Sequence, residues 1–507
     1  MLQLSKPCPF FGVESVHLHL SSAIIQRSAA ILILVASCYF LAGCLTLKSG
    51  GNPLSEDLAA KIPEQWLGMP IDVPESAATS WIHDFNSAQL TSLVRQAVDK
   101  NYNLLAASAR VRAAGARVRI AGADRYPQLS INQDSSRSQR LRGARFQKTT
   151  SNQFALGADV SWEADLWGRL SDLNKASLDQ LDASSADYQA SRLSLAADVI
   201  KTTLDLVESR MQTELSRQTL KSLQTNLEIL DAKLEIGDVN DRTALEISLS
   251  RSDVARAEAS IAQQQRDVDG AKRRLEALVG EYPAGKIAAL SRFPTVKRSV
   301  PVGLPSELLL RRPDIVAAEH RVDAALKNLS ASRKALLPSL RLTGGAGTST
   351  TEAFKDIFDP DALVWNIAYG LAQPLFEGGR LRGDIELSAA QRDELAADYA
   401  DIALNAFREV ETALAAEAFF KQQEIHLEKA SREALLAEEL SLAQYEKGLV
   451  DIITVLESQR RAFDSRSTLL NIKNQRLQNR VDLYLSLGGD FDHEPDAETL
   501  PMQKPPR

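Results

Sequence analysis

The chain has 507 residues, of which 44% are hydrophobic, 25% charged and only 6% aromatic, and its formal net charge is -7. These are average values for a soluble protein, and a mean hydropathy of -0.19 argues against a chain built from membrane-spanning helices. By length alone the chain would hold about three ordinary domains. Its acidic balance leaves no basic surface for nucleic acid, so no nucleic-acid partner is expected.

The N-terminal residues depart from this average. Arg27 precedes an apolar stretch of 16 residues, 28–43, which is shorter than the ~20 residues that cross a bilayer as a helix. A basic residue, a short apolar region and small residues at its end describe a cleavable export signal. We therefore predict that residues 1–43 are a signal peptide and that the mature chain begins at Cys44.

Residues 41–44 resemble a bacterial lipobox that ends in Cys44. This resemblance implies a diacylglycerol on the Cys44 thiol. Leu45 stands where retention in the inner membrane would usually need Asp, which implies the outer membrane. Cys8 and Cys38 leave with the signal peptide, so neither a disulfide within the mature chain nor a cysteine metal site is expected.

The remainder of the chain carries one pattern twice, at a constant spacing of 211 residues. Residues 168–170 return at 379–381, and Gly237, which follows a long polar stretch, returns as Gly448. One offset that holds over about 140 residues is the signature of an internal tandem repeat. Each copy is expected to hold the same elements in the same order.

Each copy opens with an alanine-rich helical stretch, 103–125 or 314–336, that ends before a proline, because proline cannot continue a helix. A short strand is expected next, near 129–131 and near 340–342. A polar, glycine-rich loop then leads to a longer strand, which completes one β-hairpin per copy.

The longer strand alternates between two kinds of side chain. In the first copy, large apolar residues alternate with polar and acidic ones, so one face is apolar and the other carries Asp159, Glu163 and Asp165. In the second copy, apolar residues alternate with small or polar ones from Leu363 to Leu375. We expect the acidic face to line a wetted lumen. The predicted hairpins are about 128–166 and 339–376.

Two very long helices are predicted after the hairpins. Residues 170–236 and 381–447 contain no proline and are rich in good helix formers. At 1.5 Å per residue, roughly 67 residues make a helix about 100 Å long, which no compact domain requires. Such helices must lie against equally long neighbours, as in a barrel of helices. Each copy is expected to end in a long helical hairpin, at about 168–280 and 379–488.

These elements divide the chain into an ordered series of regions. After the signal peptide come an extended N-terminal arm, the first repeat, a proline-rich connector, the second repeat and a polar tail that we expect to be disordered. The predicted boundaries are 44–80, 81–280, 281–305, 306–489 and 490–507.

An apolar strand face in an exported lipoprotein suggests a membrane barrel. Lipid tolerates only a closed barrel, because every backbone polar group must be paired. Four strands cannot close one, since membrane barrels start at about eight. If the hairpins span the membrane, the protein must therefore be an oligomer: two copies would supply eight strands, and three would supply twelve and leave room for an opening. The alternative is a small sheet that packs on the helices.

The combination of the repeat, the lipobox and four motifs resembles the outer-membrane efflux proteins, the TolC-like channels, and their NodT-type lipoprotein branch fits best. The resemblance covers about residues 80–488. It implies an α+β membrane protein, a homotrimer whose chains share a 12-stranded outer-membrane β-barrel, four strands from each, above a long periplasmic α-helical barrel. The motifs are residues 162–169, 312–315, 374–380, and Tyr445 with Gly448.

The same resemblance implies the exit duct of a tripartite efflux pump, through which small molecules or drugs leave passively. The implied partners are a periplasmic membrane-fusion adaptor and an inner-membrane RND-type transporter, and the implied location is the outer membrane, lipid-anchored and extending into the periplasm. Two alternatives remain open: the outer-membrane channel of a type I protein-secretion system, and a lipid-anchored periplasmic coiled-coil scaffold without a pore.

In this family the constriction lies near the turn between the last two long helices. Carried onto residues 448–457, the pattern implies an apolar ring at Ile453 and an acidic ring at Glu457, where relatives often have Asp. Ordinary packing at the start of a helix is the alternative for each residue. Three acids brought close together repel one another unless they are solvated or bind cations, so such a gate should respond to divalent ions.

The tips of the helical hairpins are the implied contacts for the adaptor. Grooves between antiparallel helices suit the docking of another helical hairpin. Plain turns between helices are the alternative. The implied contact residues are Gly237, Asp238, Tyr445 and Gly448.

Motifs for catalysis are not found. Residues 280–287 have the spacing of a phosphate-binding loop, but Ile287 stands where Ser or Thr must reach magnesium, and a helix end rather than a strand precedes the loop. The histidines are scattered without metal-site spacing, and no nucleophile elbow or zinc-protease motif occurs. We expect no enzyme activity, cofactor or metal.

Overall fold

The computed structural model describes residues 62–63, 66–67, 81–142, 147–237, 243–288, 290–296, 300, 305–351 and 354–489. These belong to one compact unit, residues 54–507. The predicted signal peptide, Cys44, the tail 490–507 and Asp238 lie outside the described residues, as does most of the predicted N-terminal arm.

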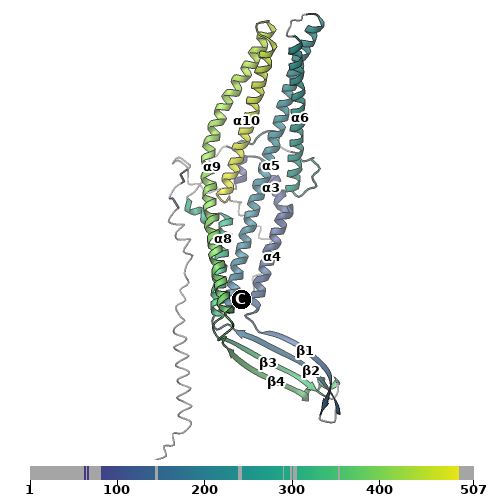
Figure 1. Cartoon of the computed structure of the whole chain (residues 1–507), viewed down its shortest axis with the longest axis vertical. Coiled ribbons are helices and arrows are strands. Elements are labelled where there is room, and N and C mark those ends of the chain that lie inside the picture. The colour runs from purple at the N-terminus through teal and green to yellow at the C-terminus, as the bar shows by residue number, and fades with distance from the viewer. Residues whose placement is uncertain are drawn as a thin grey trace, which may run out of the picture. The chain divides into compact units, whose positions relative to one another are not determined.

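The first half of the chain runs from short helices through two strands into a helical hairpin (Figure 1). Its longest helix, α5, has 67 residues, and α6 has 36. The elements are the 3-10 helix η1 (Trp81–Phe85), α3 (Ala88–Lys100), α4 (Tyr102–Ala123), β1 (Gln128–Arg142), β2 (Gln147–Ala164), α5 (Arg169–Glu235) and α6 (Thr243–Leu278).

The second half has the same order of main elements. Helix α9 has 67 residues like α5, α10 has 35, and α8 has 22 residues like α4. The elements are η2 (Pro305–Glu307), α7 (Leu308–Arg311), α8 (Pro313–Lys334), β3 (Ser339–Thr350), η3 (Phe354–Phe358), η4 (Pro360–Ala362), β4 (Leu363–Ala372), α9 (Arg380–Glu446) and α10 (Ile452–Ser486).

Local chemistry sets where the long helices begin and end. Gly168 and Gly379, with φ of 74° and 89°, stand immediately before α5 and α9. Gly237 and Gly448, with φ of 75° and 70°, stand just beyond the ends of the same helices. A left-handed backbone costs glycine little, so each glycine lets the chain turn sharply at a helix end.

The four strands form one antiparallel sheet in the order β1-β2-β3-β4. Residues 128–142 pair with 147–161, and the β2–β3 ladder from Phe154↔Thr350 to Ala164↔Leu340 joins the two halves of the chain. Strand β1 has 15 residues and is much longer than the short segment expected near 129–131. Beyond Asn132 its residues are almost all polar, so no apolar alternation marks the strand, and only its pairing with β2 defines it.

The buried core has two separate parts. The larger part lies around the middle of the helices, where Trp81, Phe85, Leu204, Ile315 and Val410 are almost completely buried. The smaller part lies near the hairpin tips and joins α5, α6 and α10, with Leu442 and Tyr445 of α9 packed against it; it consists of Leu223, Leu230, Ile247, Ile452, Val455 and Leu456. Figure 1 shows the sheet at one end of the helices and the α5–α6 and α9–α10 turns at the other. Among the described residues, no helix is both long enough and apolar enough to cross a membrane.

Candidate functional site

The sheet has two chemically different faces. On one face, the strand register places Asp159 of β2 between Ser130 of β1 and Gly345 of β3, and Gly345 is paired in turn with Asn366 of β4. Asp159 accepts a hydrogen bond from the side chain of Asn132 (2.7 Å). This face is therefore lined by small and polar side chains.

Gly345 leaves room for the polar groups of this face. A Cβ at position 345 would lie 2.7 Å from Oδ1 of Asp159 and 2.9 Å from Oδ1 of Asn366. A larger residue would push both side chains aside, so the glycine brings an acidic and an amide oxygen close together above the sheet.

The opposite face is apolar and exposed. Leu129, Val160, Gly344 and Ile367 lie in one row across the four strands, and Trp365 lies on the same face as Ile367. Ile367 and Trp365 are 79% and 73% exposed. A contiguous exposed apolar surface of this kind marks contact with a membrane or another protein.

Asp165 lies one residue beyond the strand and is not the strand acid that the alternation had predicted. Strand β2 ends at Ala164, and the Asp165 carboxylate accepts the backbone N–H groups of Leu170 (3.0 Å) and Ser171 (2.8 Å) in the first turn of α5. Burial tends to raise the pKa of Asp165, but these hydrogen bonds outweigh it and hold the pKa below its ordinary value. The left-handed Gly168 carries no side chain that could cap the helix, so Asp165 takes that role.

Glu163 lies in β2, and its side chain is held at the same junction. Its carboxylate pairs with Arg169 at 2.6 Å.

A second contact near this junction links the two halves of the chain beside the sheet. The indole of Trp167 donates to the backbone oxygen of Pro338 (2.7 Å). The sequence pattern marked Glu163 but not these partners, because the chain must turn at Gly168 before they meet.

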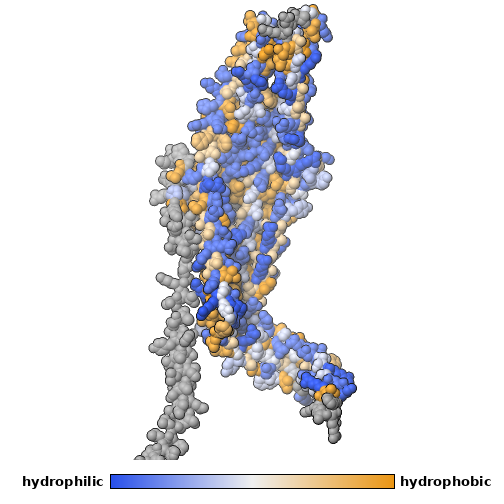
Figure 2. Space-filling model, viewed as in Figure 1, coloured by the Kyte–Doolittle hydropathy of each residue, from blue (hydrophilic) through white to orange (hydrophobic). Residues whose placement is uncertain are grey.

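At the other end of the helices, the hairpin tips hold the predicted adaptor contacts. The ammonium of Lys233 donates to the hydroxyl of Tyr445 (3.1 Å) and lies 4.5 Å from the centre of its ring, so α5 and α9 are linked there. Ile236 and Leu449, beside the two turns, are 79% and 71% exposed. Figure 2 shows apolar residues at this end of the molecule.

Helix α10 begins with Ile452, and Asp451 caps it by accepting the N–H (3.0 Å) and the hydroxyl (2.8 Å) of Thr454. Ile452 and Val455 are buried in the tip core, whereas Ile453 is 39% exposed. Ile453 therefore projects away from the packing of its own chain.

Glu457 has two partners on its own helix. It pairs with Arg460 and with Arg461, whose Nε lies 2.9 Å away. Residues three and four positions apart share one face of a helix, and this spacing was visible in the sequence. Within its own chain, Glu457 is thus an acid compensated by two arginines rather than an isolated negative charge.

A buried polar link joins α5 to α10 near these tips. Asn226 donates to Oε1 of Gln459 (2.8 Å), and Gln459 donates to the hydroxyl of Ser222 (2.8 Å). Asn226 and Gln459 are each only 3% exposed. A buried amide pair stabilises one relative position of two helices, because any slip leaves polar groups without partners.

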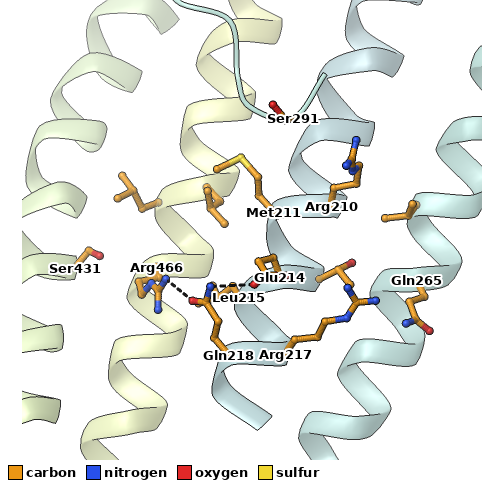
Figure 3. Close-up of a pocket in the computed structure, with 14 residues that line it drawn as sticks. Arg210, Met211, Glu214, Leu215, Arg217, Gln218, Gln265, Ser291, Ser431 and Arg466 are labelled. Atoms are coloured by element: carbon orange, nitrogen blue, oxygen red, sulfur yellow. Dashed lines mark hydrogen bonds between the residues drawn. The ribbon is translucent and has the colours of Figure 1, made fainter. Parts of the chain in front are cut away.

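Further along the helices, a cavity of about 670 Å³ lies between the two helical hairpins (Figure 3). Arg466 of α10 donates to Gln218 of α5 (3.2 Å), which donates in turn to Glu214 (3.2 Å). The other labelled side chains, among them Arg210 and Arg217, are mostly polar or basic. Met211, Leu215, Val268, Leu469 and Leu470 add apolar side chains, so the lining is mixed.

The loop with phosphate-binding spacing holds a carboxylate of the chain itself. The N–H groups of Gly285, Lys286 and Ile287 donate to Glu276 of α6 at 2.6, 2.6 and 2.9 Å. These are the groups that would have to bind a phosphate, so the segment is a connector anchored to α6.

Comparison with known proteins identifies this architecture. The profile described as Outer membrane efflux protein matches residues 93–281 and 304–489, which is more than half of the chain. The chain belongs to this family. The recognition made from the sequence is thereby confirmed.

The relatives in this family are outer-membrane proteins. The chain is 32% identical over 448 residues to the outer membrane protein OprJ of Pseudomonas aeruginosa, covering 87% of this chain and 92% of OprJ. It is 27% identical over 467 residues to SilC of Salmonella typhimurium, a probable outer membrane lipoprotein, covering 91% and 98%. A crystal structure of CusC superposes with a TM-score of 0.75 at 26% identity, covering 85% of this chain and 100% of that one.

Proposed function

We propose that this chain is the outer-membrane exit duct of a tripartite efflux system and that three copies close their sheets into one 12-stranded barrel. The observation that carries this proposal is the two-faced sheet on long helices. In the described part of the chain, β1 and β4 are the edges of the sheet and pair on one side only. Unpaired strand edges cannot face lipid, and closure with neighbouring copies satisfies them.

The chemistry of the faces supports this orientation. The exposed row with Ile367 and Trp365 would meet lipid, and the face with Asp159 and Asn366 would line water. The matched lengths of α5 and α9 support an internal tandem repeat, in which each copy supplies one β-hairpin and one long helical hairpin to the trimer.

We further propose that residues 1–43 are removed and that Cys44 carries the lipid anchor, as in a NodT-type lipoprotein. The similarity to SilC, a probable outer membrane lipoprotein, supports the assignment of a lipid anchor. Mass spectrometry of the mature chain should find a diacylglycerol on Cys44 that is absent from the Cys44→Ser variant; an unmodified wild-type N-terminus would contradict the proposal.

The free ends of the helical hairpins are proposed to meet a periplasmic adaptor that bridges to an inner-membrane RND-type transporter. Exposed Ile236 and Leu449 beside the turns at Gly237 and Gly448 support this assignment. The predicted contact Asp238 lies outside the described residues. The hydroxyl of Tyr445 is bound to Lys233, so its expected contribution to the adaptor contact comes from the ring.

The proposed gate consists of Ile453, which projects from the tip core, and Glu457. Because Glu457 forms ion pairs with both Arg460 and Arg461, Glu457→Gln leaves these two arginines without that negative charge in each chain. We expect a shift of ion selectivity toward anions and a loss of any divalent-cation effect on conductance. Glu457→Asp is the matched control that keeps the charge. An unchanged conductance and cation dependence in Glu457→Gln would remove Glu457 from the gate.

Planar-bilayer recording of the purified protein tests the function directly. A channel gives unitary currents, whereas a periplasmic scaffold without a pore gives none. In a deletion strain, greater susceptibility to small toxic compounds supports efflux. Loss of a secreted protein without a change in susceptibility would instead support type I secretion.

A further inference from the structure

Helices α5 and α8 share a seam of charged residues beside the sheet. At two points on this seam, an acid of α5 has a direct cationic partner on α8. Asp172 meets the ammonium of Lys334 at 2.5 Å, and Asp187 meets Arg321 at 2.5 Å. These ion pairs position the two helices against each other on both sides of the segment between them.

The segment between these ion pairs holds a cluster of a different kind. Asp179 and Asp182 of α5 lie together with His320 of α8, and one potential ligand atom from each residue lies within 4.8 Å of the other two. Asp179 and Asp182 are three positions apart and therefore share one face of α5. The cluster thus combines two carboxylates from one rigid helix with an imidazole from another.

Two atoms of this cluster lack partners. Oδ2 of Asp179 and Nδ1 of His320 are shielded from solvent and accept or donate no hydrogen bond among the described residues. Buried polar atoms in folded proteins are almost always paired, and an exception calls for an explanation such as a bound ion. Among the ten such atoms in the described residues, these two lie in the same cluster, on facing helices.

The surrounding charges also favour a cation. Asp323 adds a third carboxylate to the surroundings of Asp179, and Lys327 and His320 are the neighbouring groups that can carry positive charge. A carboxylate in a partly dry, acidic environment is stabilised when a cation joins it. The three carboxylates of Asp179, Asp182 and Asp323 have one lysine, Lys327, near them, so a bound cation would balance the remaining negative charge.

We propose that Asp179, Asp182 and His320 bind a divalent first-row transition metal ion that links α5 to α8. The imidazole directs the choice, because Ca²⁺ and Mg²⁺ prefer oxygen ligands alone, whereas one nitrogen with two carboxylate oxygens suits Zn²⁺ and its neighbours. Two ligand atoms that each lie about 2.0–2.2 Å from one metal ion are at most about 4.4 Å apart. The three ligand atoms here lie within 4.8 Å of one another, so small side-chain rotations would complete the site.

This site is independent of the proposed export function. Its ligands belong to the helical wall and not to the sheet face or the tips, so the metal would act as a structural link. The sequence predicted no metal, because the histidines are scattered along the chain; the acids that meet His320 come from a helix more than 130 residues earlier.

Metal binding to the full-length, detergent-solubilised protein without a polyhistidine tag tests the proposal. Equilibrium dialysis with Zn²⁺ alone should find one tightly bound ion per chain. His320→Gln and Asp182→Asn should each weaken it by at least about tenfold, the typical cost of losing even an outer-shell partner. Asp182 is exposed, so its variant remains informative if His320→Gln misfolds. His426→Gln, at an exposed histidine of α9, is the matched control and should bind like wild type.

A second readout reports the ligands themselves. Co²⁺ should give visible absorption bands in the wild type that weaken in His320→Gln. The proposal is overturned if the wild type binds no Zn²⁺, if His320→Gln and Asp182→Asn bind it as tightly as the wild type does, or if equimolar Mg²⁺ displaces it.

Discussion

At the scale of single residues, the junction between the sheet and the long helices depends on one carboxylate. Asp165 hydrogen-bonds to the N–H groups of Leu170 and Ser171, which would otherwise be unsatisfied at the start of α5. A negative charge there also interacts favourably with the helix dipole. Asp165 stands two positions after Glu163, as residues on one face of a strand do, so the sequence pattern did not predict this role. Strand β2 ends at Ala164, one residue before Asp165.

Asp165→Ala should therefore destabilise the first turn of α5 by about 0.5–2 kcal/mol, the usual range for loss of an N-terminal cap. Hydrogen exchange at Leu170 and Ser171 is the local measurement, and Asp165→Asn, which retains an accepting oxygen, is the control. Equal protection of these amides in wild type and Asp165→Ala would show that the cap is dispensable.

The lowered pKa of Asp165 also predicts a direction for the effect of acid. A carboxyl whose pKa is lower in the folded state contributes stability that is complete above its unfolded pKa of about 3.9 and disappears as pH falls through the folded value. The wild type should thus lose more thermal stability than Asp165→Asn between pH 5 and strongly acidic pH. Parallel pH profiles would contradict this prediction.

At the scale of elements, the two helical hairpins are fastened together at the tips by a small core and a polar link. The tip core draws residues from α5, α6 and α10, and Asn226 and Gln459 bridge α5 to α10 inside the wall. An apolar core permits small slips of one helix along another, whereas a buried amide pair does not. The polar link therefore fixes the position of α5 relative to α10 near the tip.

Gln459→Ala should lower the free energy of unfolding by about 1–3 kcal/mol, because Asn226 is left buried without its acceptor. The double variant Asn226→Leu, Gln459→Leu is the control: it removes both polar groups and should cost less than the sum of the single changes. Thermal unfolding of the wild type, Asn226→Leu, Gln459→Leu and the double variant in one detergent measures the coupling. Strict additivity would mean that the pair does not hold the helices.

At the scale of the whole molecule, the exposed apolar sheet face explains why a chain of average composition belongs to an outer-membrane family. The residues that would contact lipid are every second residue of four strands, too few to raise the mean hydropathy above -0.19. The long helices carry polar and charged side chains over most of their visible surface (Figure 2).

Two neighbours on β4 test this arrangement. Ile367→Lys places a charge on the proposed lipid face and should destabilise the inserted barrel by about 2–4 kcal/mol near mid-membrane. Asn366→Lys places the same charge on the opposite face and should leave assembly intact while shifting ion selectivity toward anions. Outer-membrane trimer yield and bilayer recording measure the two effects. Equal loss of assembly in both variants would contradict the assignment of the faces.

The sequence by itself determined the long helices. The predicted runs 170–236 and 381–447 differ by one residue from α5 and α9, because helix formers, the lack of proline and a terminal glycine all act locally. The family motifs are also local, and they were sufficient for recognition.

Only the tertiary structure decided which distant residues meet. Pairing of β2 with β3 joins strands that are far apart in the chain, the cap formed by Asp165 depends on a turn at Gly168, and His320 reaches Asp179 only because α5 packs on α8. Helix propensity and strand alternation describe neighbours along the chain, whereas these contacts arise from the packing of whole elements. The sequence therefore determined the long helices and the family, and the tertiary structure decided the extent of β1 and the partners of the charged and polar side chains.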